Sequence, residues 1–288
     1  MPITLLQIVI LGLIQGAAEL LPISSSAHVI VAEKLMGIDP VSPEATFLLV
    51  MLHTGTMFAV IGYFWNAWAA NYFSNQLRFR SVAKQAVGAT ILSGIVYLGL
   101  EKLLKMTLLK GPGASGEIEE LFGRLPLIAS ALAVAGLLNI VAGYWRRNDE
   151  GTEEISSESA SLMGVVQGIA LPFRGLSRSG STISAGLLIG SGQRQAEEFS
   201  FILAVIITPP VIAKESWRLL KLHSTETAPH HLFHLLAPGL VGMGCSFVGG
   251  ILALRLLSAL LARGQWQYFG YYCLAASAGV FVLAAHGW

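Results

Sequence analysis

Residues 19–28 read ELLPISSSAH, and apolar runs lie on both sides of this polar stretch. The run over residues 4–21 leads into it, and a shorter run over residues 29–36 follows. Each run is too short to cross a bilayer by itself, which takes about 20 apolar residues in a helix. Broken helices at membrane depth are tolerated only where protein buries them or where they line a wet cavity. The stretch therefore predicts an interrupted pair of helices inside a membrane protein.

The rest of the chain has the composition of a polytopic membrane protein. Of its 288 residues, 54% are hydrophobic and 12% are charged, whereas soluble domains carry roughly 25% charged residues. The net charge of +1 gives no indication of nucleic-acid binding. The polar segments 71–84 and 223–234 are predicted loops. Six long apolar runs are predicted to span the membrane: 45–65, 86–104, 126–145, 199–220, 235–261 and 268–286.

A second interrupted stretch indicates an internal duplication. The apolar run over residues 162–171 leads into FRGLSRSGST, and another short run begins at Ile183. GLIQGAA at 12–18 matches GVVQGIA at 164–170, and FLLVMLHT at 47–54 matches FILAVIIT at 201–208 in the same order. We therefore predict a first half over 1–145, an acidic, serine-rich connector over 146–161 and a second half over 162–288.

The number of membrane crossings decides how the two halves are oriented. Three long spans and one interrupted pair in each half give the copies opposite orientations. The sequence thus predicts an all-α polytopic membrane protein, an inverted repeat with two re-entrant helix pairs and about six spanning helices. Paired broken helices in such repeats point to a shared site near the middle of the membrane.

The first polar stretch combines an acid, hydroxyls and an imidazole. Serines at 24, 25 and 26 are good N-caps and leave backbone N–H groups free at the start of a helix. Ser25 and His28, three residues apart, share a helix face, and Glu19 ends the preceding run. An ionisable group at the bilayer centre costs about 2.5–3.5 kcal/mol on insertion scales. The alternative interpretation is structural: serines that cap, a histidine in the core and a glutamate that reaches the interface.

The second polar stretch has the chemistry of an anion site. Arg178 and Arg174 are fixed cations, and arginine offers a fork of donors that matches phosphate oxygens. Ser177, Ser179 and Thr182 supply hydroxyls, and glycine allows the backbone to approach a ligand closely. Arg178 could instead pair only with Glu19, although a phosphate between the two residues is compatible with that pairing.

Together the two stretches hold what phosphoryl transfer requires. That reaction needs a clamp for negative charge, a nucleophile and a proton shuttle, and all three are present in Arg178, Ser25 and the Glu19–His28 pair. Because the surrounding helices are apolar, the expected substrate is a phosphate head group with a lipid tail that stays in the bilayer.

These motifs resemble a known family. QGAAELLPISSSAH resembles the first signature of the undecaprenyl-diphosphatase (bacitracin-resistance) family, whose usual form is EGxTEFLPxSSTGH, and GLSRSGST resembles its second, PGxSRSGxT. The segments FLLVMLHTG and EFSFILAV also look like that family and occur in the right order. The resemblance covers most of the chain.

The resemblance implies a reaction, a location and a set of site residues. The family removes the terminal phosphate of undecaprenyl diphosphate to regenerate the carrier lipid for cell-wall (peptidoglycan) synthesis. It works in the bacterial plasma membrane with a site open to the outer side, and it uses a divalent cation, Mg²⁺ or Ca²⁺. The expected partners are this polyprenyl diphosphate, membrane lipids and a second copy in a homodimer, with no nucleic acid. The implied catalytic residues are Glu19, Ser25, His28 and Arg178, and we expect Glu19 to be the metal ligand as well. From the chemistry of the two polar stretches, the expected substrate-binding residues are Gln15, Ser24, Ser26, Arg174, Ser177, Ser179, Gly180 and Thr182.

Two departures from the family pattern leave alternatives open. Gln15 stands where the family has a first glutamate, and glutamine cannot carry charge or act as a base. Arg174 stands where proline is expected and adds a cation. A lipid-phosphate translocase with little or no hydrolysis is the alternative function. The nucleophile is Ser25, His28 or a metal-bound water.

Overall fold

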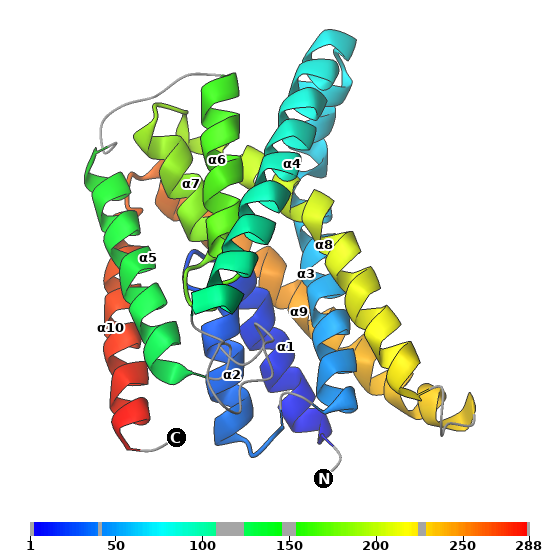
Figure 1. Cartoon of the computed structure of the whole chain (residues 1–288). Coiled ribbons are helices and arrows are strands. Elements are labelled where there is room, and N and C mark those ends of the chain that lie inside the picture. Colours follow the sequence, from blue (N-terminus) through cyan, green and yellow to red (C-terminus); the bar gives the residue numbers. More distant parts are fainter. Residues whose placement is uncertain (1–2, 40–41, 108–123, 146–153, 224–228, 287–288) are drawn as a thin grey trace.

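The computed structural model describes residues 3–39, 42–107, 124–145, 154–223 and 229–286, and this part of the chain is helical without strands (Figure 1). Six helices are long and apolar enough to cross a membrane, which confirms the prediction of a multi-pass, all-α membrane protein. They are α3 (Pro43–Trp68, continued by the π-helical turn η1, Ala69–Phe73), α4 (Gln76–Thr107), α5 (Leu125–Trp145), α8 (Gln193–His223), α9 (Pro229–Ala262) and α10 (Gln267–Ala285).

Two predicted loops are wrong because spanning helices extend beyond their apolar cores. α4 begins at Gln76, inside the segment predicted as a loop over 71–84, and α9 begins at Pro229, inside the one predicted over 223–234. The first turns of α4 are exposed and protrude from the bundle at the top of Figure 1. Hydropathy marks the part of a helix that suits lipid, whereas the helix itself continues as long as each turn satisfies its own backbone hydrogen bonds.

Four shorter helices form two hairpins, α1 (Leu5–Leu20) with α2 (Ser25–Leu35) and α6 (Ser157–Ala170) with α7 (Arg178–Leu188). α6 begins after the N-cap Ser156, so the end of the predicted connector is helical, and residues 146–153 lie outside the described part. In Figure 1 the α1–α2 hairpin occupies the lower half of the bundle and the α6–α7 hairpin the upper half. Their re-entrant placement in a membrane and the inverted repeat stay predictions.

Each hairpin packs against a helix of the other half of the chain, α1 against α9 and α6 against α4. Glycines allow these helices to approach closely. A Cβ at Gly168 would lie 2.6 Å from the Ser93 carbonyl oxygen, and a Cβ at Gly16 would collide with that of Ser246. α5, from the first half of the chain, likewise packs against α10, from the second half. The halves therefore interlock, and the turns of the two hairpins lie in one shared interior.

Candidate functional site

The turns of the two hairpins use the same backbone conformation. Ser24, directly before α2, has φ 67°, and Ser177, directly before α7, has φ 50°. Residues other than glycine rarely adopt this left-handed region, and such conformations persist where the surrounding structure imposes them. Ser177 accepts a hydrogen bond from the Gly180 N–H at 3.3 Å, whereas the Ser24 side chain makes no capping bond. Each turn reverses the chain sharply and places a helix N-terminus in the shared interior.

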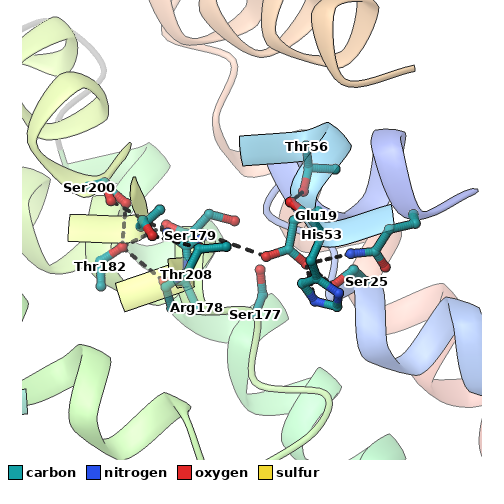
Figure 2. A network of polar contacts seen from close by, with 12 residues as sticks. Glu19, Ser25, His53, Thr56, Ser177, Arg178, Ser179, Thr182, Ser200 and Thr208 are labelled. Atoms are coloured by element: carbon teal, nitrogen blue, oxygen red, sulfur yellow. Dashed lines mark hydrogen bonds and ion pairs between the residues drawn. The ribbon is translucent and has the colours of Figure 1, made fainter. Parts of the chain in front are cut away.

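Glu19 is the centre of the site, and its two carboxylate oxygens face different partners (Figure 2). Oε1 lies 3.6 Å from Arg178 Nη2. Oε2 accepts hydrogen bonds from the Ser25 hydroxyl and from Gln15 Nε2, the latter at 3.2 Å. Both the Glu19 and Arg178 side chains are largely buried. The structure thus brings the first polar stretch and the second together around one carboxylate.

Hydroxyls surround the start of α7 and hold Arg178 in place. The guanidinium donates to the Ser200 carbonyl oxygen at 3.4 Å. Thr182 Oγ1 lies 2.8 Å from the Arg178 carbonyl oxygen and 2.6 Å from Ser200 Oγ. Ser179 Oγ donates to the Leu21 carbonyl oxygen at 3.3 Å and so ties α7 to the end of α1. Ser179 and Thr182 therefore position the turn and the arginine through contacts within the protein.

Pro22 lies in the turn between α1 and α2. Its carbonyl oxygen contacts α5 and α10, two helices that belong to neither hairpin. Asn139 on α5 is fully buried and donates from Nδ2 to the Pro22 carbonyl oxygen at 3.0 Å. Cys273 on α10 approaches the same oxygen at 3.3 Å. Asn139 also accepts a hydrogen bond from Ser184 of α7 at 2.9 Å. Buried polar groups are satisfied in this way, so α5, α7 and α10 together determine where the turn lies.

The hydrogen bonds of His28 are made with groups other than the Glu19 carboxylate. Its Nδ1 lies 2.8 Å from the Ser24 carbonyl oxygen, and its Nε2 lies 2.7 Å from the hydroxyl of Tyr272 on α10. The two rings stack with centroids 5.6 Å apart. A carbonyl oxygen only accepts, so Nδ1 carries the hydrogen in the first bond. Although His28 is close to Ser25 in sequence, its hydrogen bonds connect α2 to α10 and do not reach Glu19 or Arg178.

Arg174 and Ser26 also differ from the expectation of a single phosphate-binding cluster. Arg174 acts electrostatically on Glu33, near the opposite end of α2 from Ser25. Ser26 Oγ lies 3.4 Å from Ser24 Oγ.

Gly180 lies where the two turns approach each other, because a Cβ there would be 3.0 Å from Pro22 Cβ and 3.2 Å from Asn139 Oδ1.

One residue of this site was missed in the motifs. His53 on α3 has its Nε2 3.9 Å from Glu19 Oε2, and Figure 2 shows the two side chains together. His53 lies in FLLVMLHT, a segment that served as evidence for the duplication and for the family resemblance but not as a source of site residues. An ionisable residue in the middle of an apolar run was the available signal.

The donor atoms at the site suit a divalent cation that arrives with a phosphate. Within the described ranges, no group of three or more His, Cys, Asp and Glu side chains could hold a metal alone. Glu19 offers one carboxylate, and Mg²⁺ is commonly held by one or two carboxylates together with substrate phosphates and water. The residues present therefore fit a metal shared with the substrate.

Comparison with known proteins identifies the family to which the chain belongs. A family model described as "Bacitracin resistance protein BacA" matches residues 8–279. The chain is 52% identical over 282 residues to undecaprenyl-diphosphatase 2 of Acinetobacter baylyi, covering 97% of this chain and 98% of that protein. It is 34% identical to the undecaprenyl-diphosphatase of a Nocardioides species, covering 98% and 97% of the two chains, and 31% identical to that of Renibacterium salmoninarum, covering 98% and 96%. The chain belongs to the BacA family of bacitracin resistance proteins.

Proposed function

We propose that this protein is an undecaprenyl-diphosphatase, which removes the terminal phosphate of a polyprenyl diphosphate and regenerates the carrier lipid for cell-wall synthesis. The observation that carries the proposal is the position of Glu19 between Ser25 and Arg178. The relatives reported above carry this name, and the chain matches each of them over nearly its whole length.

The three side chains have complementary roles in phosphoryl transfer. The Arg178 guanidinium binds the oxygens of the terminal phosphate and stabilises the negative charge that spreads over them in the transition state. Ser25 is the nucleophile because its hydroxyl already donates to Glu19, which takes the proton as general base. Gln15 donates to the same carboxylate and orients it. Glu19, together with the substrate, would hold a divalent cation, which would supply further positive charge for the diphosphate.

His28 has a supporting role in this scheme. Its hydrogen bonds to the Ser24 carbonyl oxygen and to Tyr272 fix the first turn of α2 against α10. The backbone N–H groups of that turn lie at a helix N-terminus, where a phosphate is favoured. His28 thereby orients the phosphate-binding end of α2.

The lipid tail accounts for the location of the site. Helices α1 and α2 have 16 and 11 residues, and α6 and α7 have 14 and 11, so all four are shorter than a span. We place both hairpins as re-entrant pairs of an inverted repeat in the plasma membrane, with the site open to the outer side, where the diphosphate head group is presented. Irregular backbone is acceptable there because protein surrounds it.

Phosphate release from undecaprenyl diphosphate by the purified protein with Mg²⁺ or Ca²⁺ tests the function. We expect release by the wild type and a loss of about 10²–10³-fold in Arg178→Ala, as for the removal of a transition-state charge donor. Arg263→Ala is the matched control, because that arginine follows α9, outside the site. Equal rates in wild type and Arg178→Ala contradict the assignment. Movement of the lipid between vesicle leaflets without phosphate release would instead support a translocase.

A further inference from the structure

The turn before Ser25 has no side-chain cap of its own. Ser24 has φ 67°, and its side chain makes no capping hydrogen bond to α2. In the second turn Ser177 has a similar φ of 50°, but its side chain accepts a hydrogen bond from the Gly180 N–H. A left-handed conformation is unfavourable for residues other than glycine and persists only where the surroundings impose it. The conformation of the first turn must therefore be imposed by other helices.

The Pro22 carbonyl oxygen is a point at which other helices hold this turn. Pro22 lies three residues after Glu19 and three residues before Ser25, so its position determines how these two side chains meet. Asn139 Nδ2 on α5 donates to that oxygen at 3.0 Å. Cys273 Sγ on α10 approaches the same oxygen at 3.3 Å, but a thiol is a weak donor. Among the described contacts of this oxygen, the Asn139 amide is therefore the stronger donor.

The same amide is connected to the second hairpin. Asn139 Oδ1 accepts a hydrogen bond from Ser184 Oγ on α7 at 2.9 Å, and Ser184 Oγ accepts one from Trp266 Nε1 at 2.9 Å. Because the indole N–H only donates, the hydroxyl hydrogen of Ser184 is left for the amide oxygen. All three side chains are fully buried, so water does not compete for these bonds. The amide is thereby oriented with its oxygen toward α7 and its nitrogen toward Pro22.

One asparagine thus connects the two turns from a helix that belongs to neither hairpin. We propose that Asn139 is a positioning residue for the phosphatase reaction, which keeps Ser25 against the Glu19 carboxylate by holding the Pro22 carbonyl relative to α7. This inference rests on the proposed function. Asn139 acts in it through the turn, without touching the substrate. The pairing of a donor with an acceptor is what the position requires, and an apolar side chain of similar shape supplies neither.

The substitution Asn139→Leu removes both hydrogen-bonding groups and approximately keeps the size of the side chain. We expect kcat for phosphate release from undecaprenyl diphosphate to fall by about 10²-fold, the loss that follows a misplacement of about 1 Å. The KM should change by less than about threefold, because Arg178 and the start of α7 still bind the phosphate. A loss confined to KM would contradict a positioning role.

Ser277→Ala is the matched control. The Ser277 hydroxyl on α10 is buried and donates to the Ala129 carbonyl oxygen on α5 at 2.7 Å. It therefore joins α5 to another helix, as Asn139 does, but it makes no described hydrogen bond to either turn. We expect Ser277→Ala to lower the melting temperature in detergent and to keep kcat close to the wild-type value. An equal loss of kcat in Ser277→Ala and Asn139→Leu would mean that any weakening of α5 has this effect.

A double substitution distinguishes positioning of Ser25 from a general defect. In the Ser25→Ala protein there is no hydroxyl left to position, so adding Asn139→Leu should change the residual phosphate release by less than about twofold. A further loss of about 10²-fold in the double variant overturns the inference, as does wild-type kcat in Asn139→Leu. If Asn139→Leu does not elute as folded protein in size-exclusion chromatography, the milder Ser184→Ala, which only frees the Asn139 amide to rotate, is judged by the same criteria. Absence of phosphate release from the wild type would overturn the proposed function itself.

Discussion

Arg178 Nη2 lies 3.6 Å from Glu19 Oε1, although the two residues belong to different halves of the chain. Each residue comes from one of the two hairpin turns, and neither turn alone combines a cation with a base. The contact exists because α1 packs on α9 and α6 packs on α4, which interlocks the halves. In the proposed reaction, a phosphate that enters the site would compete with Glu19 for the guanidinium and would thereby come close to the Ser25 hydroxyl.

Removal of the Ser25 hydroxyl should abolish most of the phosphatase activity. In Ser25→Ala the Glu19 carboxylate keeps its contact with Arg178 but loses the group that it activates. We expect phosphate release to fall by at least about 10³-fold, as for loss of a nucleophile. Ser130→Ala is the control, since the Ser130 hydroxyl is exposed on α5 and bonds only to the Pro126 carbonyl among the described contacts. Comparable activity of the two variants would exclude Ser25 as the nucleophile.

Gln15→Glu should change the dependence on the divalent cation. The new carboxylate would lie beside Glu19 Oε2 and give the metal a second oxygen ligand. We expect half-maximal phosphate release at a metal concentration lower by about tenfold, since charge and ligand number set the affinity of such sites. Metal titrations of the activity measure this shift.

Gln167→Glu is the matched comparison for that experiment. Gln167 occupies the corresponding position of α6, but it is fully buried and donates to Ser93. A carboxylate there lacks a cation and should lower thermal stability without changing the metal dependence. An unchanged metal dependence in Gln15→Glu would mean that position 15 does not face the metal.

Gly180→Ala should destabilise the region where the two turns approach each other. A Cβ at this position would lie 3.0 Å from Pro22 Cβ and from Ser177 Oγ, so the turns must move apart. Overpacking of this kind costs about 1–3 kcal/mol. Gly94→Ala on α4 is the control, because a Cβ there meets nothing within 4 Å and alanine favours the helix by about 0.5–1 kcal/mol. Thermal unfolding in detergent should show opposite shifts, and equal shifts would contradict the packing argument.

The stability of the protein should depend on pH through Glu33. Burial raises the pKa of the Glu33 carboxyl from its ordinary value of 4.5 to about 7, while the positive charge of Arg174 acts in the opposite direction. A folded-state pKa above the unfolded value means that the contribution to stability is fully present below about pH 4.5 and is lost as the pH rises through about 7.

Glu33→Gln isolates this effect. The difference in melting temperature between the variant and the wild type should be small at about pH 4.5 and should favour the variant at about pH 8. Glu158→Gln, at an exposed position in the first turn of α6, serves as control. A difference that stays constant between the two pH values would show that Glu33 does not titrate in this range.

The positions of the helices could be predicted wherever an apolar run marked them in the sequence. The predicted run over 126–145 and α5 (Leu125–Trp145) differ by one residue, because apolar residues in lipid must satisfy their backbone bonds within the same helix. The short predicted runs around Pro22 and around RGLSRSGST correspond to the two hairpins for the same reason. Where helices extend beyond the apolar part, as at the start of α4, hydropathy alone carried no signal.

The direction of side chains could not be predicted in this way. Helical spacing places Ser25 and His28 on one face, yet His28 bonds to Tyr272 because α10 lies beside it. His53 reaches Glu19 because α3 packs on α1. Both contacts join residues on different helices that are far apart in the sequence, so no local sequence pattern predicts them.

The amino-acid sequence by itself determined that the chain is a helical membrane protein with two interrupted helix pairs and a set of ionisable residues at their turns. Those properties follow from local preferences, namely apolar length, proline and serine at helix starts, and the cost of charge in lipid. The tertiary structure alone decided which of these residues share a carboxylate: Ser25, Arg178 and His53 meet at Glu19, whereas His28 and Arg174 face other partners. That choice depends on how helices from the two halves pack against one another, which is a property of the whole fold.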